Sequence, residues 1–472
     1  FGSSPFSAYS GAHAVVANSL YPLILPGRMA MISSLGAVLC AVVFAAGDAS
    51  EPNQEFEAFV THHSRTYKPG SREYLWRRQM FDAHVAAVEA INSAPGTSWR
   101  AGVNRFADRS PLELKQLRGY RRIGQHGKRS PMQLLTTKSA SPSVDIMQLP
   151  RELSWEGKIN ATTLIQDQGQ CGSCWAFASA TVLRAHSELF RTDRAFSVQQ
   201  IVSCTQNPLS CGGAGGCEGA TAELAMDYVM RTGCTLEAKH PYTAEAAECP
   251  ADMASRQLEP HPNEGYLTLR GASFNQVDKQ LQGGLSFGMI GWRRLPENEL
   301  EPVLEALYMR GPVAVSLNAG VEWNLYQSGV FDVCKRDAII DHAVMLIGYG
   351  VDTETNMQYW KLQNSWSPSW GEAGYIRIKR LDNKDEKEYC GWDTQPEIGS
   401  GCSDGPSKVW VCGHCGILND VVEPVMALNE HGWWSRHGER SVREKHAAED
   451  ELSTSRRATS GFASRQGFLQ AA

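Results

Sequence analysis

Cysteine is distributed very unevenly along this 472-residue chain, because 12 of its 13 cysteines lie after residue 170. Proteins of reducing compartments rarely carry so many, whereas secreted proteins join them in disulfides. The clustering therefore predicts one region that is cross-linked by disulfides and that folds in an oxidising compartment. Metal binding is the competing interpretation, because closely spaced cysteines can also hold zinc.

Bulk properties narrow the class of protein further. The chain is too long for one ordinary domain, but it can bury at least one large core. Its net charge of −6 gives no polyelectrolyte signature, so we expect no nucleic-acid partner. An apolar segment at 35–46 ends in small residues and predicts a signal peptide within a leader spanning 1–47. An uncleaved membrane anchor is the alternative.

One stretch, residues 168–177 (QGQCGSCWAF), has the features of a nucleophile site. Cys174 begins an apolar, helix-compatible run over 175–189, which would place its sulfur at a helix N-terminus. The helix dipole there favours the thiolate, the reactive form of cysteine. Gln168 could direct an amide N–H at an oxygen that becomes negative beside this sulfur.

Three motifs in this chain resemble those of one enzyme family. The Cys-Gly-Ser-Cys-Trp sequence at 171–175 resembles the signature of papain-like cysteine proteases. Residues 102–108 match Gly-x-Asn-x-Phe-x-Asp, a motif of cathepsin L-like propeptides, at every specified position. Along one helical stripe, residues spaced by 4, 4, 3, 4 and 4 are similar to the ERFNIN motif of the same propeptides, with His84 and Val88 as departures: Glu73, Arg77, Phe81, His84, Val88 and Asn92. The resemblance implies an inhibitory prodomain at 51–110, which lies across the active-site cleft until it is removed.

The order of the patterns predicts how the chain is divided. A polar stretch at 111–147 predicts an exposed activation linker. A peptidase domain should follow at 148–427, with a polar insertion at about 250–288, and a polar tail at 428–472. Helical patterns come first and short strands later, which predicts an α+β fold. The papain-like resemblance implies two lobes, a helical one with the nucleophile helix and an antiparallel, barrel-like one. Periodicity predicts a helix at 300–309 and strands at 311–317, 344–349, 359–362 and 375–379.

A thiolate nucleophile needs a base, and the base needs a partner that holds its ring. A lone histidine at a strand edge is usually structural. The resemblance instead implies that His342, in Asp-His-Ala, is the general base, that Asn364 orients its ring and that Trp366 shields it from water. Cys174 would attack the scissile carbonyl, while Gln168 and the Cys174 backbone N–H stabilise the oxyanion. A Cys⁻/His⁺ pair is expected at acidic pH.

The resemblance also implies a substrate groove. Gly172 and Gly219 would pair with the substrate backbone. Ala220 and Ser367 stand where the family has glycine, which puts substrate binding at Ala220 in doubt and narrows the cleft at Ser367. The second subsite would be formed by Thr221, Ala222, Ser316, Ala343 and Asp420. Our hypothesis is that Asp420 forms the pocket floor and admits a basic side chain alongside apolar ones; the alternative is that it faces solvent.

Disulfide pairing follows from the resemblance and not from the spacing alone. It implies Cys171–Cys217 and Cys204–Cys249, with Cys211–Cys234 as an extra pair. A bridge in the second lobe would join Cys334 to Cys415 or to Cys390. At least one cysteine lacks a partner. Asn160, in Asn-Ala-Thr, is a candidate glycosylation site, although such a sequon can also remain unused.

Two other functions compete for the C-terminal cysteines. Residues 410–415 (WVCGHC) resemble the redox motif of protein disulfide isomerase, but only a charged tail follows instead of most of a thioredoxin-like domain. A zinc site is the second alternative, built from Cys390, Cys402, Cys412, His414 and Cys415. Structural disulfides fit these cysteines better.

The sequence thus predicts a cysteine endopeptidase that is made as a zymogen in the secretory pathway, for a lysosome-like compartment or for export. Its expected partners are polypeptide substrates, its own propeptide and cystatin-like inhibitors, and we expect a monomer. We expect no organic cofactor and no catalytic metal. A catalytically impaired relative that acts as a binding or structural protein is the alternative, and the intact catalytic residues argue against it. A peptide ligase would use the same residues.

Overall fold

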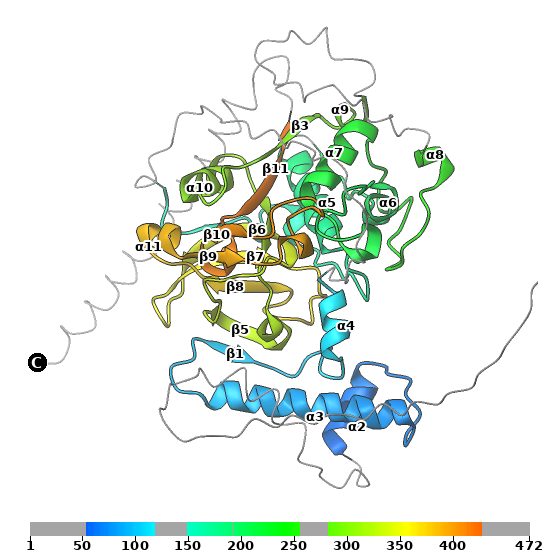
Figure 1. The fold of residues 1–472 in the computed structure, drawn as a ribbon, viewed down its shortest axis with the longest axis vertical. Coiled ribbons are helices and arrows are strands. Elements are labelled where there is room, and N and C mark those ends of the chain that lie inside the picture. Colours follow the sequence, from blue (N-terminus) through cyan, green and yellow to red (C-terminus); the bar gives the residue numbers. More distant parts are fainter. Residues whose placement is uncertain (1–52, 119–148, 191, 255–281, 427–472) are drawn as a thin grey trace, which may run out of the picture. The chain divides into compact units, whose positions relative to one another are not determined.

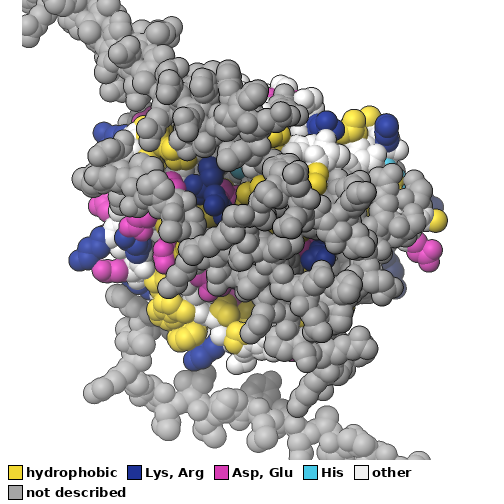
Figure 2. All heavy atoms as spheres, turned by 90° about the horizontal axis from the view of Figure 1, so that it is seen from above, with side chains coloured by type: hydrophobic (Ala, Val, Ile, Leu, Met, Phe, Trp, Pro, Cys, Tyr) yellow, Lys and Arg dark blue, Asp and Glu magenta, His cyan; other side chains and the backbone are white. Residues whose placement is uncertain are grey.

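The computed structural model (Figure 1) describes residues 53–118, 149–190, 192–254 and 282–426. The signal peptide, most of the activation linker, the middle of the insertion and the tail lie outside the described residues. Among the helices of the described ranges, none combines the length and the apolar character that a membrane span requires. On the face in Figure 2, acidic and basic side chains are interspersed over the described surface in view, without a broad area of one charge.

The first described segment is built on two helices, α2 (Gln54–His62) and α3 (Arg72–Ser93). Both begin at a side-chain cap, because Asn53 and Ser71 accept hydrogen bonds from the first free backbone N–H groups. The helices enclose a small and mainly aromatic core, formed by Phe56, Phe59, Tyr74, Phe81 and Ala107. The stripe predicted from the spacing is confirmed, since its middle residues, Arg77, Phe81 and His84, are buried.

Strand β1 (Trp99–Ala101) and helix α4 (Pro111–Gln116) complete this segment. The Asn92 side chain fixes β1, because it donates to the Ala101 carbonyl at 2.9 Å and accepts from the Ala101 N–H at 3.0 Å. Arg77 on α3 fixes α4 through two hydrogen bonds to Glu113, at 2.7 and 2.9 Å. Two residues of the helical stripe, Asn92 and Arg77, therefore hold β1 and α4 in place.

A helical lobe surrounds α5 (Cys174–Phe190), which packs against α6 (Val198–Cys204) and α7 (Ala222–Thr232). Twelve of the residues of α5 are buried, from Cys174 to Ser187. A helix that is apolar on most of its faces is stable only when other elements cover it. Here the strands β4 (Val313–Leu317), β6 (His342–Val351) and β11 (Asp420–Met426) contact it as well. The short helices α8 (Ala251–Ala254) and α9 (Gln282–Leu285) also pack in this lobe, against α6 and α7.

The second lobe contains a mixed nine-stranded sheet with the order β1-β5-β8-β7-β6-β4-β11-β3, and with β2 paired to β6. β5 and β8 are parallel, and the other pairs are antiparallel. The strands are β2 (Leu153–Ser154), β3 (Met289–Arg294), β4 (Val313–Leu317), β5 (Tyr326–Phe331), β6 (His342–Val351), β7 (Gln358–Gln363), β8 (Tyr375–Lys379) and β11 (Asp420–Met426). The prediction of strands at 311–317, 344–349, 359–362 and 375–379 is confirmed to within a few residues.

Smaller elements border this sheet. β9 (Cys390–Asp393) and β10 (Val409–Cys412) form a separate two-stranded sheet. Helix α10 (Leu300–Met309) confirms the predicted helix, and α11 (Asn383–Glu388) packs against it. Single turns of 3₁₀ helix lie at Asn160–Thr162, Gly216–Glu218, Val321–Leu325, Pro396–Ile398 and His414–Gly416.

Strand β6 joins the two lobes, because its side chains alternate between two cores. Ala343, Met345 and Ile347 belong to the core around α5. Val344 and Leu346 belong to the other core, which contains most of the buried tryptophans. The first residue of β6, His342, therefore lies where the two cores meet. The fold is α+β with two lobes, as the sequence predicts.

Five disulfides cross-link the described residues: Cys171–Cys217, Cys204–Cys249, Cys211–Cys402, Cys334–Cys415 and Cys390–Cys412. The implied pair Cys211–Cys234 is wrong, because Cys211 bonds Cys402 instead. Cys234 is a free thiol, and so is Cys174. The partner of Cys211 lies 191 positions away, in the segment before the second lobe's last strands, and a pairing so distant leaves no local spacing signal.

Candidate active site

Cys174 and His342 are brought together by the packing of α5 against β6. Cys174 is the first residue of α5, and His342 is the first residue of β6. Cys174 is only 4% exposed and His342 only 2%. The backbone N–H of Ala343, the residue after His342, lies close enough to the Cys174 sulfur to lower its pKa. A helix start and a strand start thus place a thiol beside an imidazole.

Asn364 holds the ring of His342. His342 Nε2 lies 2.9 Å from Asn364 Oδ1, which also accepts from the Ser365 N–H at 2.8 Å. Because an amide oxygen can only accept, Nε2 carries the ring proton of the neutral imidazole. His342 Nδ1 is then the free base, and among the described residues it has no hydrogen-bond partner. The Trp366 ring covers this imidazole, with 4.8 Å between ring centroids.

Gln168 is fully buried and its amide is held at both ends. Its Oε1 accepts from the Ser365 hydroxyl at 2.7 Å. Its Nε2 donates to the Cys171 carbonyl at 2.8 Å and to the Leu117 carbonyl at 2.6 Å. Leu117 directly follows α4. Its backbone carbonyl therefore occupies the Gln168 side-chain N–H that is predicted to stabilise the oxyanion.

The first segment covers the rest of this site through contacts spread along its length. β1 pairs with β5 (Figure 1). The Asn104 side chain donates to the Asn324 carbonyl at 2.7 Å, and Phe106 meets Trp366 edge to face at 5.5 Å. Arg118 lies 3.3 Å from Asp341, the residue before His342. The Gly-x-Asn-x-Phe-x-Asp motif therefore contributes directly to the cover of the site.

Burial keeps both reacting groups neutral in this covered state. Burial raises the pKa of the Cys174 thiol to about 11, although the Ala343 and Trp175 N–H groups act in the opposite direction. Burial lowers the pKa of His342 to about 3; its hydrogen bond to Asn364 opposes the shift, and the charge of Arg118 adds to it. The Cys⁻/His⁺ pair expected at acidic pH is therefore not favoured here, because the low-dielectric surroundings disfavour both ions.

The residues predicted to form the substrate groove are divided between the helical lobe and the sheet. The Gly172 N–H donates to the Cys217 carbonyl at 2.9 Å. Gly219 has a φ of +90°, and Ala220 follows it as a buried residue. Thr221 and Ala222 begin α7. In the sheet, Ala343, Ser316 and Asp420 are directly opposed across three strands.

Asp420 does not face solvent, since it is only 1% exposed. Its Oδ1 lies 3.0 Å from Nε of Arg294, and Glu223 lies beside the same guanidinium. Sequence analysis missed Arg294 and Glu223, together with Leu117. Arg294 belongs to β3, next to a segment that reads as an insertion, and Leu117 is in the expected linker. Residues 289–294 (MIGWRR) show no alternation of apolar and polar types, so the sequence carried no periodic signal for β3.

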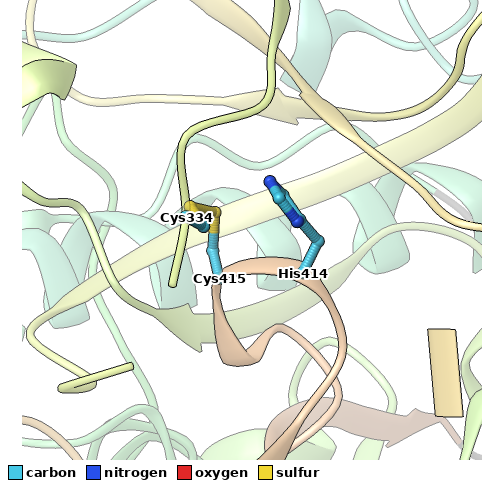
Figure 3. A group of neighbouring side chains, drawn as sticks. All are labelled: Cys334, His414 and Cys415. Atoms are coloured by element: carbon cyan, nitrogen blue, oxygen red, sulfur yellow. A yellow bond between two sulfur atoms is a disulfide. The ribbon is translucent and has the colours of Figure 1, made fainter. Parts of the chain in front are cut away.

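The C-terminal cysteines form neither a redox pair nor a zinc site. Cys412 and Cys415 bond to Cys390 and Cys334, and not to each other. Figure 3 shows His414 beside the Cys334–Cys415 disulfide. A disulfide sulfur is not a thiolate, so this group lacks the ligands that zinc requires. Cys402 is bonded as well, and both alternatives to a structural role are therefore wrong for this state.

Ser367 has a φ of +74°, a conformation that costs a non-glycine residue roughly 1–2 kcal/mol. We expect Ser367→Gly to raise the free energy of unfolding by about 0.5–1 kcal/mol, because glycine removes this strain but loses chain entropy. Denaturant titration of the inactive Cys174→Ala protein measures this. Ser369→Gly is the matched control, since it breaks the same 3.1 Å hydroxyl contact at a residue without positive φ. If both changes destabilise the protein equally, the backbone of Ser367 is not strained.

Comparison with known proteins agrees with this geometry. The profile of the papain family cysteine protease matches residues 149–399, and that of the cathepsin propeptide inhibitor domain (I29) matches residues 56–114. A senescence-specific cysteine protease of Arabidopsis thaliana is 29% identical over 338 residues, which cover 71% of this chain and 86% of that protein. Fruit bromelain of Ananas comosus is 28% identical over 352 residues, covering 72% and 86%.

Solved structures of precursors show the same fold. The recombinant stem bromelain precursor superposes with a TM-score of 0.54 at 25% identity, covering 79% of this chain and 98% of that one. Digestive procathepsin L 3 from the larval midgut of Tenebrio molitor has a TM-score of 0.55 at 23% identity, with the same coverage. The chain belongs to the papain family of cysteine proteases and carries a cathepsin-type propeptide inhibitor domain.

Proposed function

We propose that Cys174, His342, Asn364 and Gln168 are the residues with which this zymogen, once activated, hydrolyses peptide bonds. The observation that carries the proposal is the hydrogen bond from His342 Nε2 to Asn364 Oδ1, at 2.9 Å. It leaves Nδ1 as the free base of the ring, next to a thiol at the start of a helix. This is the arrangement that a cysteine nucleophile requires.

The reaction proceeds by acyl transfer. Cys174 loses its proton to His342 Nδ1, and the thiolate attacks the scissile carbonyl. The C–N bond breaks as His342 returns the proton to the leaving amine, which leaves a thioester. His342 then takes a proton from water, the hydroxide attacks the thioester, and the acid product leaves as Cys174 is restored. Asn364 holds the imidazole in position through both steps.

Gln168 stabilises the oxyanion together with the backbone N–H of Cys174. The Leu117 carbonyl, which accepts from Gln168 Nε2 at 2.6 Å, supports this role, because it is a peptide oxygen held by the same donor. It also supports an inhibitory mechanism in which the prodomain blocks the oxyanion site. Activation then requires that α4 and Leu117 leave the cleft.

Hydrolysis of a peptide substrate with Phe or Leu as the second residue before the scissile bond (P2), after acid incubation of the zymogen, tests the assignment. We expect activity to appear as the prodomain is lost. We expect Cys174→Ala to lower kcat by a factor on the order of 10⁵ or more, as for other nucleophile deletions. Cys234→Ala, which removes the other free thiol, should retain full activity. Complete removal of the prodomain without hydrolysis of the peptide substrate would contradict the assignment. It would favour a catalytically impaired relative.

Other properties are proposed on the same basis. Gly172, Gly219 and Ala220 line the groove for the substrate backbone, and a cystatin-like inhibitor would occupy the same groove in the activated monomer.

The five disulfides support folding in the secretory pathway, with export or a lysosome-like compartment as the destination. Asn160 remains a candidate glycosylation site on that route.

A further inference from the structure

Three ionisable side chains from separate elements meet beside the expected groove. They are Glu223 on α7, Arg294 on β3 and Asp420 on β11. Nε of Arg294 lies 3.0 Å from Oδ1 of Asp420 and 3.8 Å from Oε1 of Glu223. The side chains of Asp420 and Glu223 are 1% and 7% exposed, and that of Arg294 is 15% exposed. Such a group is costly to bury unless its charges are balanced.

The sheet register connects this cluster with the catalytic residues. Asp420 pairs with Ser316, and Ser316 pairs with Ala343, the residue after His342. Directly opposed residues project from the same face of a sheet, so these three side chains form one row. Two strand spacings separate Asp420 from Ala343, which is about 10 Å. The cluster therefore lies within reach of a substrate side chain near the scissile bond.

The helical wall of the same pocket also belongs to the cluster. Glu223 directly follows Thr221 and Ala222, which begin α7 and are the expected wall of the second subsite. α7 packs against β3 and β11, the strands that carry Arg294 and Asp420. The helix and the strand expected to form the two walls of this subsite thus supply the two carboxyl groups, and Arg294 lies close to both.

The guanidinium is held in this position by two further contacts. One terminal nitrogen lies 2.7 Å from the half-exposed Glu297, and the other donates to the Asn419 carbonyl at 3.2 Å. Burial lowers the pKa of Arg294, but the charges of Asp420, Glu223 and Glu297 raise it overall. Arg294 is therefore a fixed positive charge at every working pH.

Glu223 carries a proton in this environment. Burial raises its pKa to about 8, and the charge of Asp420 contributes in the same direction. Glu223 Oε2 and both oxygens of Asp420 are buried and, in the part of the chain described, accept no hydrogen bond. A protonated Glu223 would donate to Asp420 and satisfy part of this demand. The ion pair between Arg294 and Asp420 then remains at the centre of the cluster.

We infer that Arg294 is a specificity-determining residue, which neutralises Asp420 and makes the second subsite favour uncharged over basic P2 side chains. The inference rests on the proposed function and replaces the hypothesis that Asp420 recruits a basic side chain. A lysine or arginine in this pocket would meet the fixed guanidinium at close range. It would also lose its hydration without gaining an unpaired carboxylate.

The test compares two substrates that differ only at P2, Leu or Arg, at pH 5.5, with enzyme concentrations set by titration with an epoxide thiol-protease inhibitor. We expect the activated wild type to favour Leu by at least about tenfold in kcat/KM, equivalent to ~1.4 kcal/mol. Arg294→Gln should raise the Arg-to-Leu ratio at least tenfold, because Asp420 then lacks its cation. Arg294→Lys, which keeps the charge, should retain the wild-type ratio.

Three further variants separate charge from folding effects. Asp420→Asn in the Arg294→Gln background should abolish the gain for Arg. Asp420→Asn alone leaves Arg294 with only the half-exposed Glu297 as a close carboxylate, and should raise kcat/KM for a P2 Glu substrate relative to a P2 Leu substrate. Glu223→Gln should leave the Arg-to-Leu ratio within about twofold, because Glu223 is already neutral at this pH.

Hydrolysis with an unchanged Arg-to-Leu ratio in Arg294→Gln, or a wild type that cleaves both substrates equally, would overturn the inference alone. A fully processed wild type that cleaves neither substrate would overturn the proposed function, and this inference with it. The two failures are therefore distinguishable in one set of assays.

Discussion

Removal of the prodomain is expected to raise the rate at which iodoacetamide alkylates Cys174 at pH 5 by at least about 100-fold. In the covered state burial raises the thiol pKa to about 11, so the thiolate fraction at pH 5 is on the order of 10⁻⁶. In the open enzyme water reaches the site, and a histidine-paired thiolate with a pKa of ~3–4 is almost fully ionised. The lower basicity of that thiolate reduces its nucleophilicity by ~10³, which leaves the stated gain.

The rate of Cys174 alkylation should depend on pH differently before and after removal of the prodomain. A raised thiol pKa means that the covered protein gains thiolate only as the pH rises, so its rate should increase tenfold per pH unit through the neutral range. The open enzyme should react at a nearly constant rate between about pH 5 and 8. The Cys174→Ala protein measures the background from Cys234, whose pKa burial raises to about 12. Equal rates before and after removal of the prodomain would contradict the neutral pair.

The second large effect is expected at Asp108, in the prodomain. Asp108 is fully buried and lies 2.8 Å from Arg65 Nε, and it accepts a hydrogen bond from the Tyr67 hydroxyl. Removing one partner of a buried charge pair leaves the other uncompensated, at a cost of about 3–5 kcal/mol. Arg65 is 15% exposed, so we expect a cost near ~3 kcal/mol for Asp108→Ala. A prodomain of this size cannot absorb such a loss and should release the cleft.

Thermal unfolding of the Cys174→Ala zymogen, which cannot cleave itself, measures this loss, and activation of the Asp108→Ala single variant at neutral pH reports the release. Glu73→Ala is the matched control. Glu73 is 59% exposed and lies 3.7 Å from Arg77, so its removal should cost less than ~1 kcal/mol. If both variants unfold at the same temperature, the buried ion pair does not hold the prodomain together.

Local patterns predicted the features that depend on local rules. The start of α5 at Cys174 follows from its apolar run, and the stripe on α3 follows from helical spacing. The hydrogen bond between His342 and Asn364 could be expected only through the family resemblance, because the two residues lie 22 positions apart. His342 begins β6, whereas Asn364 follows the end of β7. Periodicity provides no information on such a contact.

The features that sequence reasoning missed depend on long-range packing. The position of Arg294 beside Asp420 results from the pairing of β3 with β11, two strands separated by more than 120 residues. The bond from Cys211 to Cys402 is of the same kind. The neutral state of Cys174 in the zymogen was not predicted, because it depends on burial under the prodomain and a motif does not report burial.

Pairing between β1 and β5 has a consequence for the protein after activation. In the zymogen, Trp99 of β1 covers Tyr326 and Phe331, with ring centroids 6.3 and 5.0 Å apart. When β1 leaves with the prodomain, β5 becomes an open strand edge beside newly uncovered aromatic rings. Open edges of this kind are where separate chains pair and aggregate. We therefore expect the prodomain also to protect the zymogen from aggregation, and the mature enzyme to self-associate more readily at high concentration.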